Sequence, residues 1–302
     1  MRICALAAGA LVVLLGAGCL TPGPHAHRPP RPDAIEVRGA WLRFRDTGPR
    51  DGARLPVILL HGYGSRLETW QAIQDALSSE RRVVSFDLRG FGHSERPPGP
   101  YGPEVHARDT LALMDALGIE RAVLFGHSYG GGVALRIAVE APERVAGLLL
   151  VSAFALESQL PPAFRWAKQP GLGELLFSAF YQELPGEKYL LAFHDRRRFV
   201  TLERIEEIKT MMKLPGSAYA ALQTVRGMHY ADVEEAYSQL DLPIRIVWGK
   251  EDRVLPVAQG EALAAHLDAP LVVLPACGHV PPWERPKALL REARRLLSEV
   301  EP

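Results

Sequence analysis

The sequence predicts an α/β protein with a doubly wound, mostly parallel sheet and an inserted helical cap. Three observations lead to this prediction. Short apolar runs alternate with helical patterns, most of these runs are continuously apolar, and one long stretch between two of them carries helical patterns only. Continuous apolar runs are typical of parallel strands buried on both faces, and strand–helix alternation is typical of doubly wound sheets.

Six apolar runs are the predicted parallel strands, preceded by a hairpin over 35–46 that turns at Arg38-Gly39. The runs cover 56–60, 82–86, 122–125, 145–151, 244–248 and 271–274. Predicted helices lie at 105–117, from 128 to just before Pro142, at 257–267 and at 286–300. A capping box formed by Ser65 and Glu68 predicts the start of one more helix after the first run.

The chain is expected to divide into a core and a cap. Residues 153–240 contain several helical patterns, such as 202–214, and are rich in aromatic residues and methionine. We predict that they form the cap, while 35–152 and 241–302 form the core. Most aromatic side chains of the cap should pack within it, and some should face the cleft beneath.

Composition favours a small-molecule partner. The 302 residues are 47% hydrophobic and 23% charged, and 35 basic residues balance 35 acidic ones. A neutral chain has no net field that attracts nucleic acid. We find no zinc-finger pattern, Walker loop or dinucleotide fingerprint, and therefore expect neither a metal nor a cofactor.

The first 19 residues have the layout of an export signal. Arg2 precedes an uncharged, mostly apolar run to Leu20, with small residues before Cys19. The letters "LLGAGC" resemble the lipobox of bacterial lipoproteins, although Gly16 stands where that pattern prefers Leu. The resemblance implies lipidation of Cys19 and an exported, membrane-anchored protein that faces the periplasm or the cell exterior. Signal cleavage without lipidation and a short uncleaved anchor helix remain alternatives.

The predicted linker and the cysteine count fit a tethered domain. Residues 20–34 are rich in proline, a composition typical of stiff, extended spacers. After loss of the signal and lipidation of Cys19, Cys277 would be the one free thiol, and it cannot form an internal disulfide. Because Cys277 lies two residues before His279, it is also a candidate nucleophile. The favoured interpretation is that Cys277 is a small buried residue.

The stretch Gly126-His127-Ser128-Tyr129-Gly130 predicts a nucleophile on a sharp turn. A predicted strand runs directly into it and a predicted helix runs directly out of it. Such a turn brings strand and helix backbones close together, so the residues two before and two after Ser128 must lack a Cβ atom. The alternative is a flexible glycine loop.

A serine nucleophile needs a base, and the base needs an orienting acid. Asp252 follows the predicted strand 244–248, and His279 follows the predicted strand 271–274. The carboxyl ends of parallel strands converge on one crevice, where the three side chains can meet. Alternatively, Asp252 shapes a turn and His279 is a solvated loop histidine.

Together these segments resemble the α/β-hydrolase family, in its capped serine-hydrolase branch of esterases, carbon–carbon bond hydrolases and haloperoxidases. The matching pieces are 61–64 "HGYG", 86–97 "FDLRGFGHSERP", 126–131 "GHSYGG", 248–256 "WGKEDRVLP" and 278–286 "GHVPPWERP". The resemblance implies Ser128 as nucleophile, Asp252 rather than Glu251 as acid, and His279 as general base.

Further roles follow for residues around the predicted triad. Backbone N–H groups of Tyr63 and Tyr129 are expected to form the oxyanion hole. Trp283, just past His279, is expected to contact the substrate. His61, Asp87, Arg89, His93 and His127 are expected to shape loops and pack rather than react.

The favoured function is a serine hydrolase that cleaves a small-to-medium apolar ester through an acyl-enzyme. A serine at the turn argues against epoxide hydrolases and haloalkane dehalogenases, which use aspartate there. A carbon–carbon bond hydrolase and a perhydrolase or haloperoxidase are alternatives on the same triad. A non-catalytic envelope binding protein is an alternative of another class, disfavoured because a binder has no need of all three groups.

Overall fold

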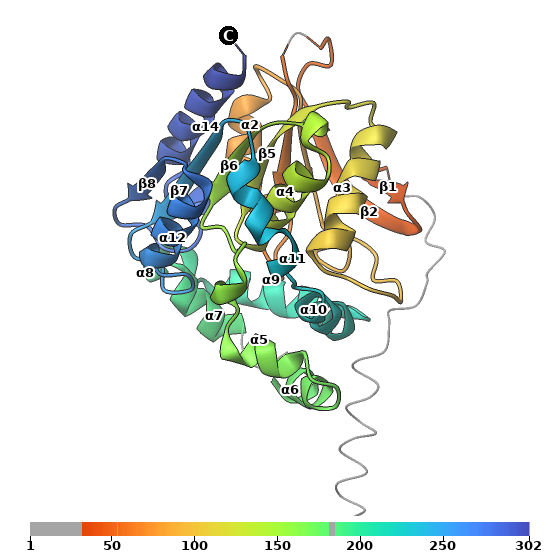
Figure 1. Ribbon diagram of the computed structural model, residues 1–302. Helices are drawn as coiled ribbons and strands as arrows, with labels where there is room; N and C mark the ends of the chain where they lie inside the picture. Colours follow the sequence, from red (N-terminus) through yellow and green to blue (C-terminus); the bar gives the residue numbers. More distant parts are fainter. Residues whose placement is uncertain (1–31, 53, 181–184, 302) are drawn as a thin grey trace, which may run out of the picture.

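A computed structural model describes residues 32–52, 54–180 and 185–301, and Figure 1 shows their arrangement. The strands of the described residues form one sheet: β1 (Ala34–Val37), β2 (Ala40–Thr47), β3 (Val57–Leu60), β4 (Val83–Phe86), β5 (Ala122–His127), β6 (Val145–Val151), β7 (Ile244–Gly249) and β8 (Leu271–Leu274). Their spatial order is β1-β2-β4-β3-β5-β6-β7-β8. β2 pairs antiparallel with β1 and β4, and every other neighbouring pair is parallel. The predicted fold class is confirmed.

Helices that follow strands of the sheet flank its two faces. They are η1 (Leu67–Trp70), α2 (Gln71–Leu77), α3 (Pro103–Ala116), α4 (Tyr129–Glu140), η2 (Pro142–Arg144), α12 (Val257–Leu267), α13 (Pro281–Glu284) and α14 (Pro286–Val300). The bounds of α12 and α14 coincide with the predicted ones.

A group of short helices lies between β6 and β7 in the sequence. They are η3 (Glu157–Gln159), α5 (Pro162–Ala167), α6 (Leu172–Phe180), α7 (Pro185–Ala192), α8 (Arg196–Phe199), α9 (Leu202–Met212), α10 (Ser217–Arg226), α11 (Ala231–Glu234) and η4 (Glu235–Gln239). Figure 1 shows α5, α6, α7, α9 and α10 gathered beyond one end of the sheet, with α5 and α6 lowest in the view. We refer to residues 153–240 as the cap.

The central strands are buried on both faces, which explains their continuous apolar sequences. Along β5, Ala122 and Leu124 belong to the apolar cluster shared with α3, α4 and α12. Val123 and Phe125 point the other way, into the cluster shared with α2 and α14. Fully burying a large apolar side chain contributes about 1.5–3 kcal/mol, so these two clusters hold the sheet between its helices.

The predicted capping box is wrong. Arg66 is the N-cap of η1 and makes no side-chain cap bond. The Glu68 carboxylate instead accepts a hydrogen bond from Arg43 at 2.6 Å, and Ser65 Oγ lies 2.7 Å from Thr69 Oγ1. A charged guanidinium is a stronger partner for a carboxylate than a neutral backbone N–H, which explains the difference.

The predicted signal segment 1–19, Cys19 and the linker up to residue 31 lie outside the described residues. Within the described part of the chain, no helix has both the length and the apolar character needed to cross a membrane.

A buried histidine joins α3 to the first residue of α4. His106 is fully buried, its Nε2 lies 3.0 Å from the backbone oxygen of Arg89, and its Nδ1 lies 2.7 Å from the phenolic oxygen of Tyr129. A neutral ring satisfies both contacts if Nε2 donates and Nδ1 accepts. Burial, which disfavours the charged ring, lowers the pKa of His106 to about 3.

We expect His106 to make folding sensitive to mild acid. The unfolded chain binds a proton on this ring near pH 6.5, whereas the folded chain does so only near pH 3, so stability falls as the pH drops below 6.5. Between pH 7.5 and pH 5 this one group should remove about 2 kcal/mol from the free energy of unfolding. His106→Gln should abolish that share of the loss, as measured by urea unfolding at both pH values.

Thr110→Val is the matched control for this comparison, because Thr110 is also buried on α3 and has no titratable group. It should lower stability by the same amount at both pH values. An unchanged pH dependence in His106→Gln would contradict the assignment of a neutral, buried ring.

Candidate active site

Ser128 lies on a strained turn between β5 and α4. Its backbone has φ 51° and ψ −122°, a left-handed conformation that side-chain-bearing residues rarely adopt. A Cβ on Gly126 would run into the backbone of Gly130 and Gly131, and a Cβ on Gly130 would run into the backbone carbonyl of Leu60. The glycines are therefore required by close backbone packing, not by loop flexibility.

The backbone of the turn is tied to the end of β6. The Ser128 N–H donates to the carbonyl of Val151 at 2.9 Å, and the Ser128 carbonyl accepts from Phe154 N–H at 2.9 Å. These bonds help to hold the strained conformation, because they fix the peptide groups on both sides of Ser128 Cα.

The three predicted catalytic side chains lie in hydrogen-bond contact. Ser128 Oγ is 3.0 Å from Nε2 of His279, and Nδ1 of His279 is 2.8 Å from Oδ2 of Asp252. Ser128 follows β5, Asp252 follows β7 and His279 follows β8, so three strand ends deliver them to one place. Asp252 and His279 are buried, and Ser128 is half-buried.

The second oxygen of Asp252 is also occupied. Oδ1 accepts from the backbone N–H groups of Val254 at 2.9 Å and Leu255 at 2.8 Å. Both interpretations of Asp252 therefore hold, since the same carboxylate shapes its turn and contacts the imidazole. Glu251 was the less favoured candidate for the acid. Its Oε2 accepts a hydrogen bond from the N–H of Cys277 at 2.9 Å.

His127 contacts the backbone of the candidate base His279. Its Nε2 donates to the backbone oxygen of His279 at 2.8 Å, and the two rings are 5.1 Å apart. Burial, and next the nearby His279, lower the pKa of His127 to about 3. The ring is therefore neutral at physiological pH and acts as a hydrogen-bond donor to the His279 peptide.

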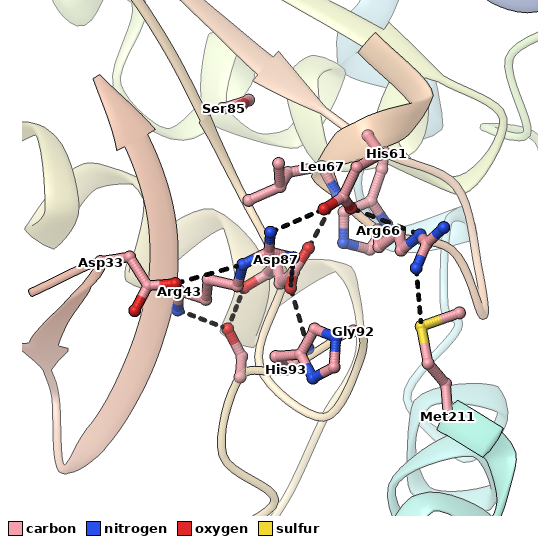
Figure 2. A network of polar contacts seen from close by, with 12 residues as sticks. Asp33, Arg43, His61, Arg66, Leu67, Ser85, Asp87, Gly92, His93 and Met211 are labelled. Carbon is pink, nitrogen blue, oxygen red and sulfur yellow. Dashed lines mark hydrogen bonds and ion pairs between the residues drawn. The ribbon is translucent and has the colours of Figure 1, made fainter. Parts of the chain in front are cut away.

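A buried carboxylate joins the loops that follow β3 and β4, as Figure 2 shows. Oδ1 of Asp87 accepts from the N–H of Leu67 at 2.7 Å, and Oδ2 accepts from the N–H of His93 at 2.8 Å. Gly92 has φ 51°, and a Cβ there would meet the Asp87 carboxylate. Asp87 thus fixes two loops near the site, in agreement with its predicted turn-shaping role.

His61 has a comparable structural role beside Asp87. Its Nε2 accepts from the N–H of Leu88 at 2.9 Å, and its Nδ1 lies 2.8 Å from the carbonyl of Gly62. Burial lowers the pKa of His61, so the neutral ring connects the loop after β3 to the end of β4. His61 therefore supports the backbone that leads into Tyr63.

An apolar cavity of about 420 Å³ opens beside Ser128. Tyr63, Tyr129 and His279 line it together with Ser128, which puts both expected oxyanion-hole residues at the cavity. Much of the remaining wall is apolar and includes Phe154, Phe164, Phe193, Ile208, Met228 and Trp283. Cap aromatics thus reach the cleft as predicted, and the wall includes Trp283.

The exposed part of the cavity wall comes from both core and cap. Leu191 at the end of α7 is 49% exposed and Val254 after β7 is 44% exposed, although both line the cavity. Arg253 is exposed beside them and also lines the cavity. The exposed wall that the structure describes is therefore apolar at Leu191 and Val254, with the Arg253 side chain next to them.

The remaining candidates do not suggest other chemistry. Cys277 is buried, and burial raises the pKa of its thiol, so it matches the small buried residue that was the favoured interpretation. Among the described residues, no group of three or more His, Cys, Asp or Glu side chains could hold a metal ion.

Sequence reasoning missed one residue beside the site. Glu284 is buried and accepts hydrogen bonds from the backbone of the His279 loop and of the cap. The available signal was a lone carboxylate within the otherwise apolar stretch 280–284, because a buried charge needs partners. Its partners in the cap are far away in sequence and could not be identified from it.

Comparison with known proteins identifies the family of the chain. Residues 56–286 match the family model of the α/β-hydrolase fold. The chain is 31% identical over 260 residues to the dihydrolipoyllysine-residue acetyltransferase component of the acetoin cleaving system of Pseudomonas putida, covering 83% of this chain and 65% of that protein. It therefore spans slightly less than two thirds of that relative.

Two further relatives are hydrolases by name. The chain is 28% identical to 2-hydroxymuconate semialdehyde hydrolase of Pseudomonas sp. (strain CF600), with 76% of this chain and 81% of that protein covered. Among solved structures, a thermophilic esterase from Thermogutta terrifontis is 31% identical, covers 89% of this chain and 98% of its own, and has a TM-score of 0.73. With a family match over more than half of its length, the chain belongs to the α/β-hydrolase fold family.

Proposed function

We propose that the protein is a serine hydrolase that cleaves a small-to-medium apolar ester through an acyl-enzyme. The observation that carries the proposal is the hydrogen-bonded series Asp252–His279–Ser128 at the wall of an apolar cavity. Ser128 is the nucleophile, His279 the general base and Asp252 the orienting acid. The likeness to a thermophilic esterase supports the same reaction class.

The hydrogen bonds support the following path for the proton. Asp252 accepts from His279 Nδ1–H, which leaves the Nε2 lone pair free to receive the proton of Ser128 Oγ–H. Oγ then attacks the ester carbonyl, and the tetrahedral intermediate collapses as His279 returns the proton to the leaving alcohol. A water molecule activated by the same imidazole hydrolyses the acyl-enzyme.

The negative oxygen of the intermediate needs N–H donors. Tyr129 is the first residue of α4, where N–H groups have no partner inside the helix and the helix dipole favours negative charge. Tyr63 approaches the cavity from the loop after β3. The proposed oxyanion hole consists of the backbone N–H groups of these two residues, and this geometry can stabilise the intermediate by a few kcal/mol.

Carbon–carbon bond hydrolysis is the second candidate, favoured by the likeness to 2-hydroxymuconate semialdehyde hydrolase. It would use the same triad, as would a perhydrolase or haloperoxidase reaction. The apolar wall around Phe164, Phe193 and Met228 favours the ester because it offers few polar groups for a charged substrate.

The proposed location is outside the cytoplasm, on a membrane. It rests on the signal layout of residues 1–19 and on Cys19 as the lipidation site. A lipid at Cys19 and a proline-rich linker would hold the catalytic domain close to lipid or envelope-derived esters.

Ser128 should be the reactive nucleophile towards a fluorophosphonate probe. We expect stoichiometric labelling of the protein, because His279 can deprotonate Ser128 Oγ, and no labelling of Ser128→Ala. Intact-mass spectrometry measures both. Absence of labelling in a well-folded protein would favour a non-catalytic binder instead.

His279→Ala should lower the kcat of ester hydrolysis by about 10³-fold or more, because it removes the imidazole that contacts Ser128 Oγ and would take its proton. Circular dichroism should be unchanged. A rate close to that of the parent protein would refute the general-base assignment.

A series of p-nitrophenyl esters should distinguish the candidate substrates. Each added CH₂ of the acyl chain contributes about 0.8 kcal/mol when buried, so kcat/KM should rise about fourfold per carbon until the cavity is full and then fall. Turnover of a vinylogous diketone faster than that of every ester would favour carbon–carbon bond hydrolysis.

A further inference from the structure

The loop that carries His279 is fixed through its peptide groups. The N–H of Cys277 donates to Glu251 Oε2 at 2.9 Å, and the N–H of His279 donates to the carbonyl of Ala192 at 2.7 Å. The N–H of Gly278, between them, donates to Oε2 of Glu284. Two carboxylates and one cap carbonyl therefore hold three consecutive N–H groups.

Glu284 also binds the cap. Its Oε1 accepts from the backbone N–H groups of His194 at 2.8 Å and Asp195 at 3.0 Å. One buried carboxylate, 6% exposed, thus bridges the Gly278 peptide of the core and two consecutive peptides after α7 of the cap. Hydrogen bonds to an ionised acceptor are roughly twice as strong as neutral ones.

The cap segment and the loop are in close backbone contact at Gly278. A Cβ on Gly278 would run into the carbonyl of Ala192 and the N–H of His194, so glycine alone allows this approach. The rings of Phe193 and Trp283, which come from the two sides, stack at 5.7 Å with 10° between their planes. A cap displaced here would remove all of these contacts together.

No cation competes for Glu284 in the described structure. Among the described residues, no Lys or Arg side chain forms an ion pair with it, although Arg196, Arg197, Arg198 and Arg285 line a cleft that Glu284 also lines. The hydrogen bonds that the carboxylate accepts come from backbone N–H groups. Glu284 itself does not line the cavity beside Ser128, so it can affect a substrate only through residues that it positions, such as His279.

We propose that Glu284 is a positioning residue that holds the His279 loop in register with Ser128 and Asp252 by locking residues 192–195 of the cap onto it. This inference rests on the proposed serine hydrolase function. Loss of the lock lets the imidazole move away from Ser128 Oγ, and a misplacement of about 1 Å can cost about 100-fold in rate.

The test compares Glu284→Ala and Glu284→Gln with Glu292→Gln. Glu292 on α14 is equally buried but accepts from Arg245 and Arg295, away from the site. Glutamine keeps one acceptor oxygen and turns an N–H group towards the remaining backbone donors, so it should act as an intermediate variant. Fluorophosphonate labelling rate and p-nitrophenyl ester kinetics are measured for each protein.

We expect kcat and the labelling rate to fall about 100-fold in Glu284→Ala and about 10-fold in Glu284→Gln. KM should change less than kcat does, because Glu284 itself does not line the cavity and every wall side chain of the parent protein is still present. Glu292→Gln should keep kcat within twofold, whatever it does to the melting temperature. A kcat within twofold of the parent in folded Glu284→Gln would overturn the proposal.

Hydrogen exchange tests the lock without any substrate. The amides of His194, Asp195 and Gly278 should exchange faster, and to a similar extent, in Glu284→Gln than in Glu292→Gln. Unchanged exchange at these amides overturns the lock even if activity falls. If the parent protein neither reacts with the probe nor cleaves esters, the proposed function fails, whereas the exchange result still decides whether Glu284 joins cap and loop.

Discussion

The parallel register of β5, β7 and β8 is the constraint on which the site depends. Ser128 lies 151 residues from His279 in the sequence, and Asp252 lies 27 residues from it, yet each of the three follows the carboxyl end of its strand. β7 and β8 pair up to Gly249 and Leu274, so their following loops start side by side. A Cβ on Gly249 would meet the carbonyl of Gly278, which shows how closely the two loops pack. The short contacts of the triad follow from this shared edge.

Buried polar groups then make that edge rigid. Burial favours the neutral form of His61, His106 and His127 in the folded protein. Through its ring nitrogens, each of these residues contacts a segment that follows a different strand from its own. Asp87 does the same with a carboxylate for the loops after β3 and β4. An unpaired buried polar group costs about 1–3 kcal/mol of stability. Movement of any of these loops would therefore be unfavourable, because it would break buried hydrogen bonds that water does not replace. Ser128 and His279 are held by this network, and the strained backbone of Ser128 can persist because the surrounding structure fixes it.

The sequence allowed the fold to be predicted well because its strands are buried on both faces. Continuous apolar runs such as 145–151 mark a strand whatever its neighbours are, and the bounds of β6 and β8 agree with the predicted runs. Local polar motifs predicted the structure less well. The capping box expected for Ser65 and Glu68 does not form, because Glu68 makes an ion pair with Arg43, which is distant in sequence. The contacts of Asp252 with Val254 and Leu255 are local, whereas Glu284 acts through His194 and Asp195, about 90 residues away. Such a role depends on how the cap folds over the core, which no local pattern encodes.

Residues 279–284 contact Ser128, the cavity and the cap within six consecutive positions. His279 contacts Ser128, Val280 and Trp283 line the cavity, and Glu284 holds the cap. Trp283 also stacks on Phe193, which in turn stacks on Phe199. The Arg204 guanidinium lies 4.8 Å from the ring centre of Trp283 and 5.4 Å from that of Phe199. A change in the cavity wall at Trp283 therefore disturbs the cap contact and the base together. Ile208 and Met212 of α9 line the cavity from the cap and belong neither to the His279 loop nor to residues 192–195. Changes at these two wall positions should therefore alter the shape of the cavity at little cost to the contacts of Ser128, His279 and Asp252. The segment after β8 and residues 192–195, which bind it, have to satisfy both requirements at once.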